Sequence, residues 1–124
     1  MRLEQSLLTA KHYTMRKAEI KLHDRTAGWL THDENGYHFV YDAVYLNSGA
    51  SEPVSLTLPL QEASFTGKVL FPFFDGLIPE GWLLEIAEKN WKLNPRDRMG
   101  LLMACCKDCI GAVSVHPVME EDNP

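Results

Sequence analysis

Three cysteines stand close together near the C-terminal end of the chain, at Cys105, Cys106 and Cys109, and His116 follows seven residues after the last of them. Thiolates and imidazoles at short spacing bind zinc, and two cysteines with this separation can also cycle between dithiol and disulfide. A structural zinc site needs a fourth ligand at a recognisable spacing, and His116 lies at the end of an expected strand. We therefore expect single buried thiols that pack as small apolar residues, without a metal.

A second pair of chemically active side chains is His32 and His38, which flank Asn35-Gly36 and are expected to face each other across a hairpin. Zinc requires three or four ligands, so two histidines without a third are more consistent with surface strand residues. The chain has no Gly-rich phosphate loop, no nucleophile elbow and no His-x-x-x-His pair. These absences predict a protein that is not an enzyme and that uses no cofactor.

The most unusual stretch is Phe71-Pro-Phe-Phe-Asp-Gly-Leu-Ile-Pro-Glu-Gly-Trp82, which holds four aromatic residues, two prolines and two glycines in twelve positions. It is too apolar for a solvated loop and too interrupted for one helix, so it predicts a helix end, a tight bend and a new helix start. Trp82 lies in the first turn after the bend. Its indole either projects as an interface anchor or caps the core of its own domain, and both interpretations stay open.

Composition limits the function classes. The chain has 124 residues, a formal charge of −5 and a pI near 5.5, which predicts one domain with a basic partner and argues against direct binding to nucleic acid. An odd number of cysteines favours a reducing compartment. No apolar run approaches the ~18 residues of a membrane span, and the N-terminus lacks the apolar core of a secretory signal. A cytoplasmic location is expected.

The elements that must position these residues begin with strands. Alternation of apolar and charged residues predicts a half-buried strand over 17–22, and a turn is expected at Asp24-Arg-Thr. Asn35-Gly36 predicts a two-residue hairpin with positive φ at both central positions, joining 28–33 to 37–41. Within 37–41 the three aromatic residues share one face. A further strand is expected at 54–60, with Val54, Leu56, Leu58 and Leu60 on one face, and the connection 61–67 is expected to be polar.

Helices are expected in the second half. One starts near Lys68, capped by Thr66 or Ser64, or at Phe71, where Pro72 falls in the tolerated first turn. A second runs from about Glu80 to Trp91, and a third spans 98–106 with Leu101, Leu102 and Cys105 facing inward. The last strand is 111–115. The result is an α+β fold, a small antiparallel sheet packed against two or three short helices, with an N-terminal extension (1–16), a domain (17–117) and an acidic tail (118–124).

The order of these motifs resembles the N-terminal subdomain of the HipA serine/threonine kinase toxins, over about Ala18 to Pro117. The chain departs from full-length HipA toxins because it carries none of the kinase core and has about 16 additional N-terminal residues. In this it is similar to HipS, the small protein of the three-component HipBST toxin–antitoxin systems. The motifs that carry the resemblance are the Asn-Gly hairpin, Pro53-Val-Ser-Leu-Thr-Leu-Pro-Leu60, Phe73-Phe-Asp-Gly-Leu-Ile-Pro-Glu-Gly81, Leu101-Leu102 and Asp108-Cys-Ile-Gly-Ala-Val113.

The resemblance implies an antitoxin that binds a HipT-like kinase toxin and holds it inactive, with a HipB-like DNA-binding protein completing a ternary complex. Trp82 would plug the kinase cleft with Pro79 and Gly81 shaping the bend, while Asp75 and Glu80 meet basic groups or merely cap helices. Positioning of the kinase lobes is a second possible mechanism. Rival interpretations are a structural subunit that completes the kinase fold without inhibiting it, a small thiol or metal protein, and a DNA-binding protein.

Overall fold

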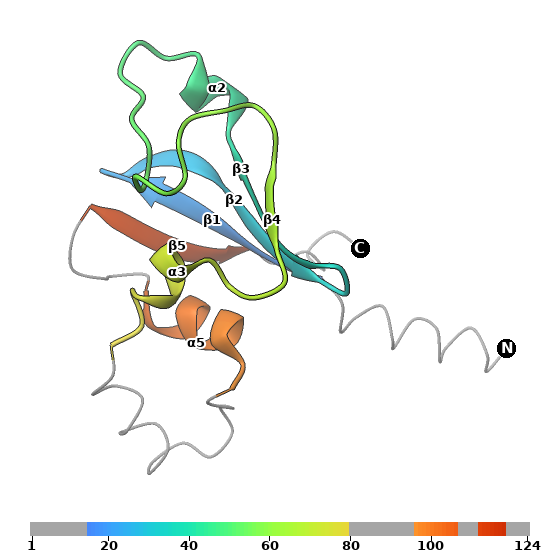
Figure 1. The fold of residues 1–124 in the computed structure, drawn as a ribbon. Coiled ribbons are helices and arrows are strands. Elements are labelled where there is room, and N and C mark those ends of the chain that lie inside the picture. Colours follow the sequence, from blue (N-terminus) through green and yellow to red (C-terminus); the bar gives the residue numbers. More distant parts are fainter. Residues whose placement is uncertain (1–14, 80–95, 107–111, 119–124) are drawn as a thin grey trace, which may run out of the picture.

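A computed structural model describes residues 15–79, 96–106 and 112–118 of the chain (Figure 1). Its centre is a five-stranded antiparallel sheet with the order β4-β3-β2-β1-β5, so the first strand pairs with the last. None of the helices in the described ranges is long and apolar enough to cross a membrane. The strands are β1 (Arg16–Leu22), β2 (Arg25–Asp33), β3 (Gly36–Tyr41), β4 (Phe65–Gly67) and β5 (Val113–Val118).

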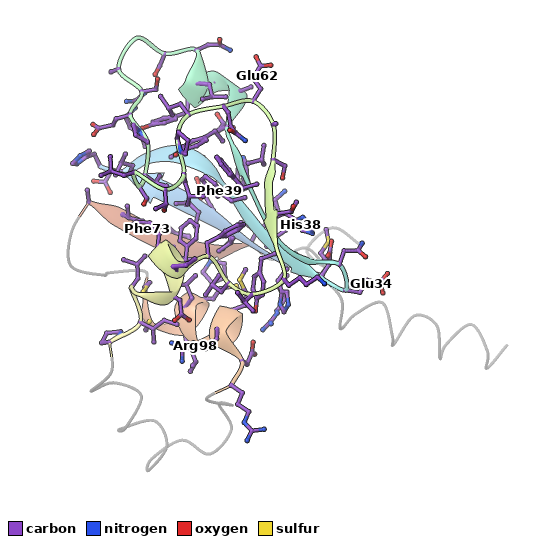
Figure 2. All side chains as sticks on the ribbon, in the orientation of Figure 1. Glu34, His38, Phe39, Glu62, Phe73 and Arg98 are labelled. Atoms are coloured by element: carbon purple, nitrogen blue, oxygen red, sulfur yellow. The ribbon has the colours of Figure 1, made fainter. Side chains whose placement is uncertain are left out.

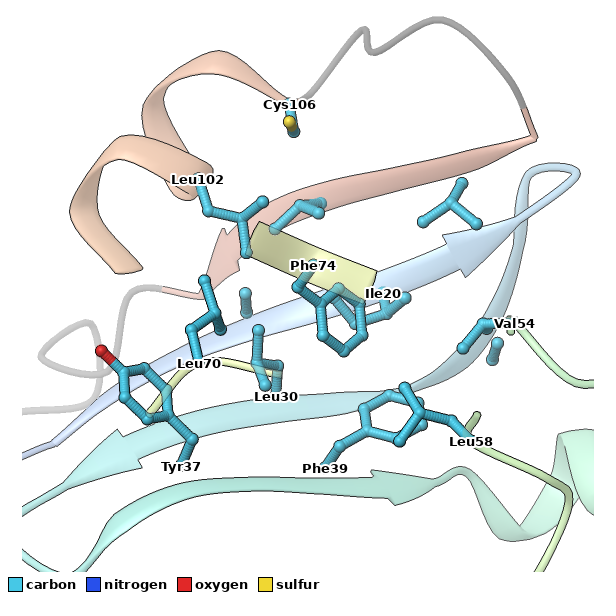
Figure 3. Close-up of a cluster of buried hydrophobic side chains, with 14 of the residues drawn as sticks. Ile20, Leu30, Tyr37, Phe39, Val54, Leu58, Leu70, Phe74, Leu102 and Cys106 are labelled. Atoms are coloured by element: carbon cyan, nitrogen blue, oxygen red, sulfur yellow. The ribbon is translucent and has the colours of Figure 1, made fainter. Parts of the chain in front are cut away.

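Within the described ranges, three short helices accompany the sheet: α2 (Ala43–Leu46), α3 (Pro72–Asp75) and α5 (Arg98–Cys105). The apolar side of α3 and α5 packs against the inner face of the sheet, where Phe74 of α3 meets Phe39 of β3 with 5.5 Å between ring centroids (Figure 3). Phe74, Phe39 and Ile20 are fully buried. The expected α+β fold, with an antiparallel sheet and short helices, is thus confirmed.

Alternation of side chains sets the inner face, as predicted from the sequence. In β1 the residues Ala18, Ile20 and Leu22 point into the core, while Lys17, Glu19 and Lys21 lie on the outer face. In β3 the three aromatic residues are buried and the intervening ones are half-buried, which confirms that prediction as well.

The two hairpin turns distribute positive φ differently from the prediction. The hairpin between β2 and β3 is confirmed, but its central residues are Glu34 and Asn35, and only Gly36 has positive φ, at 119°. A Cβ on Gly36 would lie 2.4 Å from the carbonyl oxygen of Gly67, so a side chain is excluded there. Positive φ at two adjacent residues occurs instead in the β1–β2 turn, one residue earlier than expected, at His23 (53°) and Asp24 (67°).

The predicted strand over 54–60 is wrong. Within this segment Val54 and Leu58 are buried but Leu56 is 94% exposed, so the four apolar residues do not share a face. The segment forms a tight turn instead, in which the Leu58 N–H donates to the Ser55 carbonyl at 3.0 Å. Pro53 and Pro59 lack N–H donors at both ends, which disfavours a ladder and leaves the turn as the stable arrangement.

Other element boundaries also differ from the prediction. The short β4 lies inside the stretch expected to be a polar connection, and Thr66, expected as a helix cap, is part of this strand. The helix α3 begins at Pro72 with Phe71 as its N-cap, as the later of the two predicted starts requires. The sequence gives no periodic signal for α2, which has only one turn.

Near the C-terminus, the predicted third helix is confirmed as α5, although Cys105 is only half-buried while Met99 is fully buried. The last strand extends through Pro117 to Val118, beyond its predicted end, so Val118 belongs to the sheet and not to an acidic tail. The expected helix from Glu80 to Trp91 lies outside the described residues.

Candidate functional site

The expected partner-binding bend starts in α3, and the structure describes its first part as far as Pro79. Ile78 is buried and its N–H donates to the Asp75 carbonyl at 3.2 Å, so the chain is fixed to the core until it leaves at the exposed Pro79. Of the other predicted contact residues, Glu80, Gly81 and Trp82 lie outside the described part of the chain.

The remaining predicted contact residue, Asp75, has an intramolecular partner. Its Oδ1 accepts a hydrogen bond of 2.6 Å from Nε of Arg98, which joins α3 to α5 (Figure 2). The Asp75 side chain is 41% exposed, so this ion pair lies at the surface and contributes little to stability. Its consequence is positional: the base of the bend is tied to the first residue of the next described helix.

A second ion pair fixes the start of α5 to the start of β1. Asp97 is the N-cap of α5 and accepts from the Gly100 N–H at 3.1 Å, while both of its carboxylate oxygens accept from Arg16 at 2.8 Å. The hydrogen bonds from Arg16 lower the pKa of Asp97. A bidentate Arg–carboxylate contact is geometrically specific, so it holds the helix in one position relative to the sheet.

His32 belongs to this ion pair and not to a metal pair. Its Nδ1 accepts from Nη2 of Arg16 at 3.0 Å, and its ring stacks on Tyr37 with centroids 4.0 Å apart. Burial, and secondarily the charge of Arg16, lowers the pKa of His32. His32 pairs with Tyr37 and His38 pairs with Thr31, so the two histidines lie on opposite faces of the sheet, and the expectation that they face each other is wrong.

The cysteines depart from the expectation of single thiols. Cys106 is fully buried but is disulfide-bonded. Cys105 is a free thiol, and its Sγ lies 3.2 Å from Sγ of Cys106, which is too far for a disulfide bond between the two. Burial raises the pKa of the Cys105 thiol. His116 lies within β5 and bonds Ser114, and Cys109 lies outside the described residues. In the part of the chain that is described, no three side chains of His, Cys, Asp or Glu gather into a metal-binding group.

A cavity of about 350 Å³ lies at the end of the sheet where β1 turns into β2, next to α3. We call it the end groove. Its walls are mainly apolar, and its only polar side chains are those of His23 and Glu52, which are exposed at its rim. The residues that line it are Leu22, His23, Glu52, Pro53, Val54, Phe73, Leu77, Ala112 and Val113.

Two tyrosine hydroxyls hold one wall of the end groove. The Tyr45 hydroxyl accepts from the Glu52 N–H at 3.0 Å and donates to the Glu52 carbonyl at 2.7 Å. The Tyr41 hydroxyl accepts from the Val54 N–H at 3.0 Å and donates to the Leu58 carbonyl. Because these backbone groups are already hydrogen-bonded, this wall of the groove is preformed.

Sequence reasoning did not find the end groove, because it unites four segments that are far apart along the chain. The sequence indicates only the turn beside the groove, which is expected at Asp24-Arg-Thr and lies at His23 and Asp24.

Comparison with known proteins gives a consistent picture. Residues 18–116 match the model of the HipA N-terminal domain. The chain is 30% identical over 102 residues to an uncharacterised protein of Haemophilus influenzae, covering 82% of this chain and 92% of that protein. The solved structure of the N-terminal domain of HipA toxin superposes with a TM-score of 0.67 at 26% identity, covering 85% of this chain and 94% of that one.

Two larger relatives come from Sinorhizobium fredii. The putative kinase Y4mE is 28% identical over 109 residues, and the putative kinase Y4dM is 27% identical over 113 residues. The matched region covers 87% and 86% of this chain but only 26% and 28% of the two kinases. The chain therefore spans about a quarter of the length of these relatives.

Proposed function

The chain belongs to the HipA N-terminal domain family, and from this premise we propose that it binds a HipT-like serine/threonine kinase toxin and inhibits it as an antitoxin. The observation that carries the proposal is the family match over 18–116, together with putative kinases in which the matched region makes up only about a quarter of the chain. A domain that belongs to the same chain as a kinase is expected to have a surface that contacts the kinase. A HipB-like DNA-binding protein completes the complex, since the charge of −5 disfavours contact of this chain with DNA itself.

The bend is the proposed inhibitory element. Its base is rigid, because Ile78 is buried in the core and Asp75 is paired with Arg98. A rigid base lets a following side chain enter a cleft without a large loss of conformational entropy. We assign that role to Trp82, because tryptophan is enriched among the residues that dominate interface energy. Pro79 and Gly81 shape the bend, and Glu80 contributes negative charge toward basic groups of the kinase cleft. Asp75, which is paired with Arg98, instead holds the base of the bend.

The test is growth of cells that express a cognate HipT-like kinase together with wild-type chain, Trp82→Ala or the matched control Trp91→Ala. Wild type and the control are expected to restore growth, whereas Trp82→Ala fails to do so, since loss of such an anchor costs about 2 kcal/mol or more. Circular dichroism and a pull-down establish that the variant is folded and whether it still binds. Equal rescue by Trp82→Ala would show that the plug is wrong.

A second candidate is a structural subunit that completes the kinase fold without inhibiting it. It is favoured by the presence of the same domain within putative kinases. Phosphorylation measured with and without this chain separates the two functions. Inhibition supports the antitoxin, and activation supports the structural subunit.

A further inference from the structure

We propose that the end groove is a second contact site for the kinase partner, and that it binds a large apolar side chain of that partner with a lysine or arginine next to it. This inference rests on the proposed function and adds a site that is separate from Trp82. It depends on the size of the groove, its apolar and preformed walls, the polar side chains and negative charge at its rim, and its position next to the bend.

Size and wall chemistry favour a side chain of a protein. A volume of about 350 Å³ accommodates one large side chain with its neighbouring backbone. Small polar ligands need convergent polar groups inside the pocket that fix their orientation. Here the polar side chains, His23 and Glu52, are both at the exposed rim, and the interior presents Val54, Phe73 and Val113.

The groove is also preformed. The Tyr45 and Tyr41 hydroxyls hold the wall that carries Glu52 and Val54. On the opposite side, the His23 N–H donates to the Ala112 carbonyl at 2.8 Å, which ties the β1–β2 turn to the start of β5. A preformed pocket loses little entropy on binding, so its occupant gains most of the free energy of burial.

The β1–β2 turn brings two polar side chains to the groove end of the sheet. His23 and Asp24 are the two central residues between the paired Leu22 and Arg25, and both have positive φ. A two-residue hairpin favours positive φ at both central positions, and Asp and His adopt it more readily than most residues with a side chain. The turn therefore presents these two polar side chains at the end of the sheet where the groove lies.

The charges at this end favour a basic occupant. Glu52 and Asp24 are exposed, and no residue of the described ranges forms an ion pair with either carboxylate. The neighbouring cation, Arg25, is held by other partners: it donates to Ser48 Oγ at 2.8 Å and to the Ala50 carbonyl at 3.2 Å, and its guanidinium lies 4.9 Å from the centroid of the Tyr45 ring. An ammonium or guanidinium group beside the apolar anchor would compensate this negative rim.

Finally, the groove is continuous with the proposed inhibitory element. Phe73 of α3 and Leu77 just after it form one wall of the groove, and the proposed inhibitory bend follows directly, through the buried Ile78 and the exposed Pro79. In Figure 2, Phe73 belongs to α3, whereas Arg98 belongs to the neighbouring helix α5. A kinase that receives the bend therefore lies within reach of the groove as well.

The experiment measures binding of the purified cognate HipT-like kinase by calorimetry to the full chain and four variants. Ala112→Trp fills the groove from its exposed rim, and Glu52→Lys reverses its charge. Ala63→Trp and Glu62→Lys are the matched controls, at exposed residues outside the groove lining. Urea unfolding of each variant verifies the fold, and Glu52→Lys tests the site even where the bulky substitution disturbs the turn.

We expect Ala112→Trp to weaken binding by about 30-fold, as loss of a buried anchor does, and Glu52→Lys by about tenfold, with both controls binding as wild type. Binding of both groove variants at wild-type affinity would overturn this inference and leave the proposed function intact. If the wild-type chain itself does not bind the kinase, the proposed function fails and this inference fails with it.

Discussion

At the scale of single residues, the site that responds to pH is His32. Its ring accepts a hydrogen bond from Arg16 and stacks on Tyr37, and Asp97, Asp33 and His38 are the other charged or titratable groups near it. Protonation would remove the acceptor lone pair and place a second cation beside Arg16. Burial, and secondarily the charge of Arg16, therefore favours neutral His32 in the folded protein, and the pKa of this histidine is lower than the ordinary value of 6.5.

This lowered pKa predicts that stability decreases on acidification. Above pH ~6.5 His32 is neutral in both states and contributes no pH dependence. As the pH falls below that value, the unfolded chain binds a proton that the folded chain excludes, so the free energy of unfolding decreases until the folded pKa is passed. His32→Asn, which keeps a hydrogen-bond acceptor, should lose this part of the pH dependence. Urea midpoints of both proteins between pH 8 and pH 5 measure the difference.

The comparison of wild type with variant isolates His32, because all other histidines are common to both proteins. Asp97 does not interfere in this range: its pKa lies below 3.8, so its contribution is lost only at more acidic pH. An equal decrease of stability in the two proteins would exclude His32 as the cause.

At the scale of elements, α5 depends on the contact between its N-cap and its third residue. Alanine is a better helix former than glycine by about 1 kcal/mol, so Gly100→Ala would ordinarily stabilise the helix. Here a Cβ on Gly100 would lie 2.4 Å from Oδ2 of Asp97, a carboxylate that Arg16 holds in place. We predict that Gly100→Ala destabilises the domain by about 1 kcal/mol, through loss of the cap.

A double-mutant cycle checks this explanation. In the Asp97→Ala background the obstructing carboxylate is absent, so Gly100→Ala should stabilise the protein relative to Asp97→Ala alone. Urea unfolding of the four proteins gives the coupling between the two sites. A stabilising effect of Gly100→Ala in the wild-type background would mean that the carboxylate moves aside without cost.

Elements with a strong local signal could be predicted from the sequence, and those made by distant contacts could not. The alternation in β1 and the Asn35-Gly36 pair indicated strands correctly, because each pattern reflects burial of one face or the demands of one turn. The segment 54–60 has the same alternation, yet the Val54 N–H donates to the hydroxyl of Tyr41 in β3 and not to a neighbouring strand. No local pattern reports such a partner.

The candidate site divides in the same way. Composition alone predicts the bend, because two prolines and two glycines lie among aromatic residues, and α3 ends at Asp75 within this stretch, which the structure describes as far as Pro79. The pairing of Asp75 with Arg98 and the assembly of the end groove depend on the tertiary arrangement of helices and turns. A sequence pattern can therefore indicate where a helix ends, but it cannot identify a surface that segments far apart in the chain form together.

At the scale of the whole molecule, one short helix serves both the fold and the proposed groove. Phe74 and Phe73 are neighbours in α3 with ring centroids 5.1 Å apart, but Phe74 is fully buried against Phe39 whereas Phe73 is half-buried and lines the end groove. We therefore expect Phe74 to serve stability and Phe73 to serve the proposed binding, although each contributes one aromatic ring to the same helical turn.

Phe74→Ala is expected to reduce the free energy of unfolding by about 3–5 kcal/mol, a large fraction of the roughly 5–15 kcal/mol of a typical domain. Phe73→Ala should cost only about 1–2 kcal/mol, because less apolar area is removed from burial. Under conditions in which both variants are folded, Phe73→Ala should weaken kinase binding more than Phe74→Ala does. If Phe73→Ala weakens kinase binding no more than Phe74→Ala does, α3 serves the core alone, and any contact with the kinase lies elsewhere on this domain.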